Sequence, residues 1–196
     1  MTTPPTKAHV RGYAPAARRL LKTLLVLLAS AAFVSWSWQQ PFMAKPRALW
    51  ELSRLPPPLA LPVPVQGVAA SRIADTFGAP RGTTRTHAGL DIFAKRGTPV
   101  LSTTRGVVIA VREAGLGGKQ VWIAGPARER HYYAHLDDWA QGLGPGDLVL
   151  PGDVLGIVGD TGNARGTPPH LHYGIYGASG AYDPLPLLRA HVTPLQ

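Results

Sequence analysis

Residues 152–176 read GDVLGIVGDTGNARGTPPHLHYGIY, and this stretch decides the fold class of the chain. Two short apolar runs within it, Val154–Val158 and His170–Tyr176, have the length and composition of β-strands. Gly159–Gly162, with the sequence GDTG, marks a turn between them. Residues i and i+2 of a strand point to the same face. His170 and His172 are therefore expected to enter one pocket, while Leu171 enters the core.

The same texture of short β-branched runs divided by Gly, Asp and Pro begins near Gln66. Further strands are predicted over Thr98–Thr103, Gly106–Arg112, Gln120–Ala124 and Arg130–His135. Gly-rich or Pro-Gly-Asp turns separate them, and no amphipathic helix of any length interrupts the pattern. The sequence therefore predicts an antiparallel all-β domain over residues 66–196, large enough to bury its own core.

A second polar motif lies upstream, in His87-Ala-Gly-Leu-Asp91. Metal ligands spaced i, i+4 are familiar on one face of a helix, but Gly89 breaks a helix here and Ile92-Phe93 follows. This context favours a loop that runs into a strand, with Asp91 at the start of the strand. No Glu lies near either motif, so a general base would have to come from elsewhere.

Histidines supply the remaining candidates. Strand alternation predicts that His131, Tyr133 and His135 share one face, with His131 in a structural role. The chain has no cysteine, so any metal must be held by His, Asp or Glu, which suits zinc in a catalytic site rather than a structural one. Three such ligands would leave zinc an open position, and a further histidine could transfer protons beside it.

Three segments carry a family resemblance: HAGLDI at 87–92, YYAHLD at 132–137, and the stretch at 152–176. Over residues 73–176 the chain resembles the lysostaphin/LytM-type zinc endopeptidases of bacterial peptidoglycan. The resemblance implies an antiparallel sandwich or open barrel of the lysostaphin (duplicated hybrid motif) kind, with one zinc per domain. It implies that His87, Asp91 and His172 bind the zinc and that His135 and His170 serve catalysis.

The implied activity is hydrolysis of the peptide cross-links of peptidoglycan by water activated at zinc, with histidine as general acid and base. Which of His135 and His170 is the base stays open, as does the cross-link that is cut. One alternative is a wall-binding or regulatory protein that uses the same fold without catalysis. Another is a biotinyl or lipoyl carrier domain, but Lys95 and Lys119 do not have the hairpin-tip setting that such a domain needs.

The charge distribution argues against a nucleic-acid partner. The chain has 20 basic and 11 acidic residues, a formal charge of +9. Seven of the basic residues and none of the acidic ones lie in residues 1–50, which leaves 13 basic and 11 acidic residues after them. Most of the basicity therefore belongs to the N-terminal segment and not to the folded domain.

The N-terminal segment predicts export. A basic leader over residues 1–19 precedes an apolar run over residues 20–38 that ends in tryptophans, as in a transmembrane signal anchor with its N-terminus inside. A cleaved signal peptide is the alternative, since Ala29-Ser30-Ala31 offers a cleavage site. Residues 39–65 are rich in proline and are expected to form an extended linker, in which a short helical turn can form around Ala48–Leu55. Both alternatives place the β domain in the periplasm or outside the cell, with the lipid bilayer as a partner of the anchor.

Overall fold

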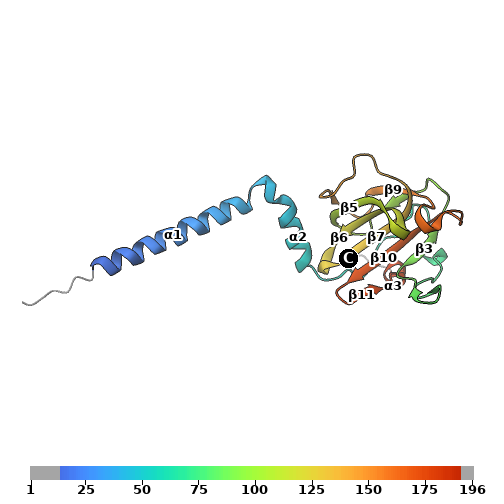
Figure 1. Ribbon diagram of the computed structural model, residues 1–196, viewed down its shortest axis with the longest axis horizontal. Helices are drawn as coiled ribbons and strands as arrows, with labels where there is room; N and C mark the ends of the chain where they lie inside the picture. The colour runs from blue at the N-terminus through green and yellow to red at the C-terminus, as the bar shows by residue number, and fades with distance from the viewer. Residues whose placement is uncertain (1–13, 191–196) are drawn as a thin grey trace, which may run out of the picture. The chain divides into compact units, whose positions relative to one another are not determined.

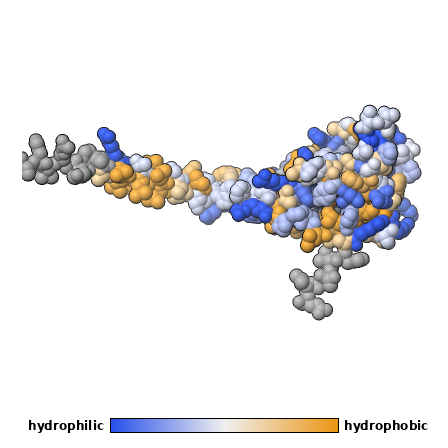
Figure 2. Space-filling model, turned by 90° about the horizontal axis from the view of Figure 1, so that it is seen from below, coloured by the Kyte–Doolittle hydropathy of each residue, from blue (hydrophilic) through white to orange (hydrophobic). Residues whose placement is uncertain are grey.

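The computed structural model describes residues 14–190, which divide into two compact units between Ala44 and Lys45. In the first unit, helix α1 spans Ala14–Trp38 and is built mainly of the strong helix formers leucine and alanine. Its part from Ala17 to Trp38 is long and apolar enough to cross a membrane, by length and composition, and apolar side chains dominate the middle of the helix on the face that Figure 2 shows. The predicted span of residues 20–38 thus falls within one helix. Most of the predicted leader lies outside the described residues.

The extended linker predicted over residues 39–65 is wrong for its first half. A 3₁₀ turn, η1 (Pro41–Met43), is followed by helix α2 (Ala44–Arg54), which is longer than the single turn expected there. Pro46 lies in the first turn of α2, where its missing amide hydrogen costs no hydrogen bond, and Leu52 is buried. The proline-rich extended segment is therefore confined to the residues after Arg54.

The folded domain also begins earlier than residue 66. Leu61 and Val65 both belong to the hydrophobic core. Val65 forms a β-bridge with Val100, and the Leu61 amide donates to the Leu187 carbonyl at 3.0 Å. Pro62 and Pro64 lie between these two residues and hide the strand-like pattern, which explains why the sequence predicts a linker up to residue 65.

A nine-stranded antiparallel sheet forms the second unit (Figure 1), and a separate two-stranded hairpin joins it. The strands of the large sheet are β3 (Leu90–Phe93), β4 (Pro99–Leu101), β5 (Gly106–Ala114), β6 (Gly118–Ala124), β7 (Arg130–Trp139), β8 (Leu148–Val149), β9 (Val154–Val158), β10 (His170–Gly177) and β11 (Gly180–Tyr182). The hairpin consists of β1 (Pro80–Arg81) and β2 (Arg85–Thr86). The remaining elements are 3₁₀ turns η2 (Ala70–Arg72), η3 (Gly115–Gly117), η4 (Pro126–Arg128) and η5 (Gly162–Ala164), and helix α3 (Leu185–Arg189).

Strand order places β10 at the centre of the site-bearing region. The main path runs β11-β10-β7-β6-β5-β8, and β10 also pairs with β3, while β9 pairs with β4 and β7. The prediction of an all-β antiparallel domain is confirmed. All six predicted strands occur, although β5, β6, β7 and β10 extend beyond their predicted bounds and β4 is shorter than predicted. The sequence does not predict the short elements β1, β2, β8, β11 and α3, because two to five residues carry too little periodicity to be read.

One face of the sheet is buried in a core of aliphatic and tyrosine side chains. Leu171, Tyr173 and Ile175 alternate along β10 and are fully buried, as are Leu90 on β3 and Tyr133 on β7. The hydroxyls of Tyr133 and Tyr173 both hydrogen-bond the Thr103 hydroxyl at 2.8 Å, so the polar atoms of these two tyrosines are satisfied within the core. Neither tyrosine therefore serves the pocket on the other face.

Candidate metal centre and active site

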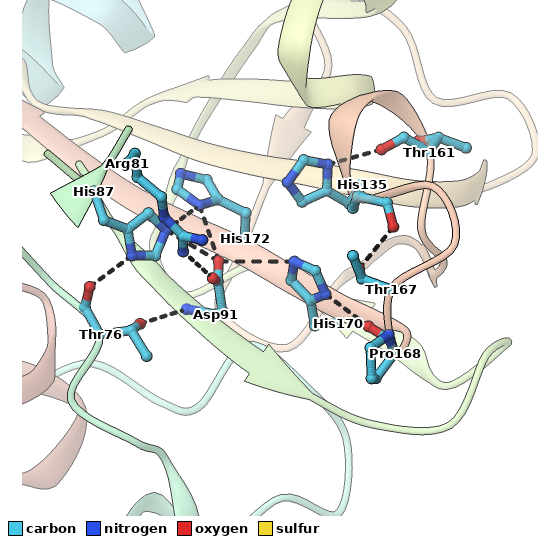
Figure 3. Close-up of polar contacts among 11 residues, drawn as sticks. Thr76, Arg81, His87, Asp91, His135, Thr161, Thr167, Pro168, His170 and His172 are labelled. Atoms are coloured by element: carbon cyan, nitrogen blue, oxygen red, sulfur yellow. Dashed lines mark hydrogen bonds and ion pairs between the residues drawn. The ribbon is translucent and has the colours of Figure 1, made fainter. Parts of the chain in front are cut away.

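Pairing of β3 with β10 brings two of the predicted ligands together. In the antiparallel register Asp91 lies directly opposite His172, and opposite residues share a face of the sheet. The loop before β3 adds His87. The His87 Nε2 atom lies 2.9 Å from His172 Nδ1 and 3.0 Å from Asp91 Oδ1, and the last two atoms are 3.3 Å apart. Three donor atoms from segments far apart in the sequence thus converge on one point (Figure 3).

These separations fit a small divalent cation. Two ligands of a tetrahedral zinc, each about 2.0–2.1 Å from the metal, lie about 3.3 Å from each other. The His87 Nδ1 atom lies 2.7 Å from the Thr76 carbonyl, which fixes the proton on Nδ1 and leaves a lone pair on the converging Nε2. Burial lowers the pKa of His172, which favours the neutral ring that a metal needs. The residues present therefore fit a zinc site.

Asp91 is held as a carboxylate by its surroundings. Burial opposes its ionisation, but the hydrogen bond with His172 and the adjacent His87 ring outweigh burial and hold the pKa of Asp91 far below its ordinary value. The guanidinium of Arg81, on strand β1, forms an ion pair with the second carboxylate oxygen, Oδ2. Oδ1 is thereby left to face the two histidines, as a ligand that binds through one oxygen requires.

Thr76 and Arg81 are functional candidates that the sequence alone did not reveal. The Thr76 hydroxyl accepts a hydrogen bond from the Asp91 amide at 3.0 Å, so one residue supports two ligands, His87 through its carbonyl and Asp91 through its side chain. Both residues precede the HxxxD motif at spacings that no strand or helix period predicts. Their roles follow only from the fold.

Gly89, between the two ligands of the HxxxD motif, is required by close packing. A Cβ atom at this position would lie 2.9 Å from two atoms of the His172 ring and closer still to the Tyr173 carbonyl oxygen. Real Cβ atoms essentially never make such contacts. Glycine therefore lets the loop before β3 lie directly against β10, which brings His87 within reach of His172.

His135 and His170 lie beside this cluster and present the same nitrogen to it. The His170 Nδ1 atom is 2.8 Å from the Pro168 carbonyl, and the His135 Nδ1 atom is 2.9 Å from the Thr161 carbonyl. Both rings are thus protonated on Nδ1 and keep a free Nε2 lone pair. The His170 Nε2 atom lies 3.8 Å from Asp91 Oδ1, and the His135 ring centroid lies 5.1 Å from that of His170 and 5.8 Å from that of His172.

The predicted alternation along the strand that contains His135 is wrong. His131 and Tyr133 point into the core, where the His131 Nδ1 atom lies 2.9 Å from the Tyr173 hydroxyl, while His135 reaches the opposite face. The pairing of β6 with β7 changes register here: Lys119 faces Leu136 and Val121 faces Tyr133, so Gln120 alone opposes two residues. His135 is one of the two and has the left-handed φ of 63° that such a bulge uses.

The bulge gives His135 its environment. Burial, together with the neighbouring His172, lowers the pKa of His135 to about 4. The ring is therefore neutral near pH 7, with a lone pair directed at the ligand cluster. Non-glycine residues with positive φ are uncommon and concentrate at functional sites, where the surrounding structure compensates for the strain.

An open cavity of about 630 Å³ leads to the five residues. Arg81 and Arg85 of the β1–β2 hairpin line one part of it. Three aromatic side chains form another wall: Trp122 stacks on Tyr132 with ring centroids 4.2 Å apart, and Tyr176 lies 5.4 Å from Trp122. The cavity has room for an extended peptide segment, and its floor carries the clustered donor atoms.

Comparison with known proteins identifies the family. The family model described as "Peptidase family M23" matches residues 85–184, which is about half of the chain and contains all five site residues. The chain belongs to peptidase family M23. The sequence-based assignment to lysostaphin/LytM-type peptidases is thereby confirmed.

Relatives of known name agree with this assignment. The chain is 41% identical over 142 residues to the L-Ala–D-Glu endopeptidase of Bacillus subtilis, covering 67% of this chain and 43% of that protein. It is 34% identical over 113 residues to lysostaphin of Staphylococcus simulans, covering 53% of this chain and 22% of that protein. The chain thus spans less than half the length of these relatives.

Solved structures show the same fold. The catalytic domain of lysostaphin from Staphylococcus simulans superimposes with a TM-score of 0.54 at 29% identity, covering 62% of this chain and 96% of that domain. A peptidase M23 from Pseudomonas aeruginosa, described as putative, superimposes with a TM-score of 0.53 at 27% identity, covering 79% of this chain and 64% of that one. The predicted lysostaphin-type fold is therefore confirmed.

Proposed function

We propose that this protein is a zinc-dependent endopeptidase that hydrolyses peptide cross-links of bacterial peptidoglycan. His87, Asp91 and His172 would hold one zinc ion, and His135 and His170 would transfer protons. The observation that carries the proposal is the convergence of three ligand atoms within 2.9–3.3 Å of one another, beside two histidines with free Nε2 lone pairs, on the floor of an open cavity. The names of the relatives support peptidoglycan as the substrate.

Zinc in this site would supply Lewis acidity, polarising the scissile carbonyl and lowering the pKa of water to about 7. The protein's own residues do the rest. Asp91 stays ionised, and the ion pair with Arg81 keeps its carboxylate in one orientation. One of His135 and His170 would accept at Nε2 the proton that the attacking water loses. The same pair would then give a proton to the leaving amine.

A wall-binding or regulatory protein without catalysis is the alternative, and the complete site weighs against it. Binding alone requires neither three converging donor atoms nor two histidine rings whose orientation is fixed by hydrogen bonds from Nδ1 to backbone carbonyls.

Digestion of purified sacculi by the full-length chain in detergent tests the proposal. Mass spectrometry of the released fragments should show newly formed peptide termini, whose identity defines the bond that is cut. A metal chelator should abolish release and added zinc should restore it. His172→Ala, expected to lose zinc, serves as the matched inactive control. Intact sacculi after incubation with zinc-loaded wild-type protein would refute the proposal.

We further propose that α1 is a retained anchor that holds the peptidase domain on the outer side of the cytoplasmic membrane. Support comes from the continuous apolar helix to Trp38 and from Arg18, Arg19 and Lys22 near its start. Sequencing the N-terminus of the protein from membranes tests the proposal. A mature N-terminus near Ala32 would show instead that a signal peptide is removed.

A further inference from the structure

Two arginines face each other across the small hairpin that borders the cavity. In the antiparallel register of β1 and β2, Arg81 lies directly opposite Arg85, so both side chains leave the same face of the hairpin. Both side chains line the cavity that leads to the metal centre. Figure 3 shows Arg81 at the His87 end of the site and His135 with His170 at the other end.

Like charges directly opposite each other destabilise a strand pair, so this arrangement calls for a compensating anion. Arg81 has one in Asp91. Among the described residues that line the cavity, Asp91 is the only acidic one, and no acidic side chain within the described chain pairs with Arg85. A divalent cation bound by Asp91 would neutralise the carboxylate charge that now pairs with Arg81. The cavity would then carry a net positive charge on the hairpin side.

Guanidinium groups suit this position for recognition of a carboxylate. Arginine has five N–H donors in a planar fork that matches a carboxylate in two-point contact. Arg81 uses its NH2 group for Asp91 Oδ2, and its side chain is still 44% exposed. Arg81 contacts Asp91 directly, so its remaining donors lie beside the proposed metal ligand. A carboxylate bound there would belong to the scissile residue or its neighbour, because one extended residue spans only about 3.3–3.6 Å.

We propose that Arg81 and Arg85 together bind a carboxylate of the substrate peptide, located within one residue of the scissile bond. The substrate class would thus be an acidic peptide, with its free carboxylate on the hairpin side of the metal. This inference rests on the proposed peptidase function and deepens it by naming a determinant of specificity. Arg81 also acts as a positioning residue for Asp91, whereas Arg85 is free to serve the substrate alone.

The test compares two peptides that differ only in this carboxylate. One carries the free acid in the residue next to the scissile bond, and the other carries the uncharged carboxamide in its place. Zinc-loaded full-length protein in detergent is expected to show a kcat/KM about 10- to 100-fold higher for the acid, as charge-assisted hydrogen bonds imply. The preference should shrink as the salt concentration rises, because the cavity is open to solvent.

Variants of Arg85 assign the preference to the hairpin. Arg85→Gln should lose most of the ratio between acid and carboxamide, mainly through KM, and Arg85→Lys should retain part of it. Arg105→Gln is the matched control, because Arg105 is an exposed arginine that does not line the cavity and lies 3.7 Å from Glu51. This control should leave the ratio unchanged.

Calorimetric binding of the same two peptides to zinc-loaded His170→Ala provides a readout that does not depend on turnover. Tighter binding of the acid than of the carboxamide, lost in a His170→Ala/Arg85→Gln double variant, supports the proposal. It does so even if the wild-type protein hydrolyses neither peptide, a result that would refute only the peptidase function. Equal binding of acid and carboxamide overturns the carboxylate site. A fall in kcat/KM by the same factor for both peptides in Arg85→Gln also overturns it, while the peptidase function stands.

Discussion

Replacing Gly89 by alanine tests whether the contact between the loop and β10 builds the metal centre. The new Cβ would lie 2.9 Å from the Nε2 and Cε1 atoms of His172, and closer to the Tyr173 carbonyl oxygen. The carbonyl is backbone in a paired strand, so the structure must shift rather than rotate a side chain. Overpacking of this kind costs about 1–3 kcal/mol.

The expected change is measurable in two ways. A domain of this size loses about 2–4 °C in Tm for each kcal/mol, so Gly89→Ala should lower Tm by about 2–12 °C in the zinc-free protein. Displacement of His172 should also weaken zinc binding by about 10- to 100-fold, the range found when the support of a metal ligand is removed. Thermal unfolding monitored by circular dichroism gives the first quantity, and competition with a chromophoric chelator gives the second.

Gly144→Ala is the matched control for this substitution. A Cβ at Gly144 would meet nothing closer than the Asp147 carboxylate at 4.0 Å, and the backbone there has no positive φ. The control should therefore retain zinc affinity and lose no stability through overpacking. If Gly89→Ala matched Gly144→Ala in both Tm and zinc affinity, the reasoning from close packing would be refuted.

Three further predictions concern the histidines. His172→Ala should lose near-stoichiometric zinc in elemental analysis, and retention of the metal would remove His172 from the ligand set. His135→Ala and His170→Ala should each keep zinc yet lose about 10²–10⁴-fold in kcat on released-peptide assays, and wild-type turnover would clear that residue of a catalytic role. Burial lowers the pKa of His131 to about 4. As the pH drops, His131 therefore takes up a proton in the unfolded state before it does so in the folded state. The free energy of unfolding should fall as the pH drops from about 6.5 towards 4. Chemical denaturation of the zinc-free protein should show this slope, and an equal slope in His131→Gln would contradict its assignment to His131.

The sequence was sufficient to predict the longer strands and the convergence of the HxxxD and HxH motifs. Alternation along residues 170–176 placed His170 and His172 on one face and Leu171 in the core, and the structure has this arrangement. The same rule failed at His135, because a bulge shifts the alternation by one residue. The residue with the left-handed φ in this bulge is His135 itself, so no glycine marks the bulge in the sequence. Periodicity cannot reveal an extra residue when both faces of the strand already carry histidine and tyrosine.

Other features were out of reach because they depend on contacts between distant segments. Arg81 and Thr76 support the proposed metal ligands through an ion pair and through hydrogen bonds that span 11 and 15 residues. Leu61 and Val65 join the core although prolines surround them. In each case the decisive partner is set by the fold, and no local pattern names it.

Two different parts of the structure position the proposed metal ligands and the histidines proposed to transfer protons. Pairing of β3 with β10 fixes Asp91 and His172, whereas the segment between β9 and β10 fixes His135 and His170 through the carbonyls of Thr161 and Pro168. The Thr161 hydroxyl also accepts from the Lys119 amide at 2.9 Å and donates to the Leu136 carbonyl at 2.8 Å, so it satisfies backbone groups beside the bulge. Substitutions in the segment between β9 and β10 should therefore lower the turnover number by displacing His135, while the pairing of β3 with β10 still positions the proposed metal ligands. The bulge can persist because Thr161 bonds both strands that flank it, which compensates locally for the strained φ of His135.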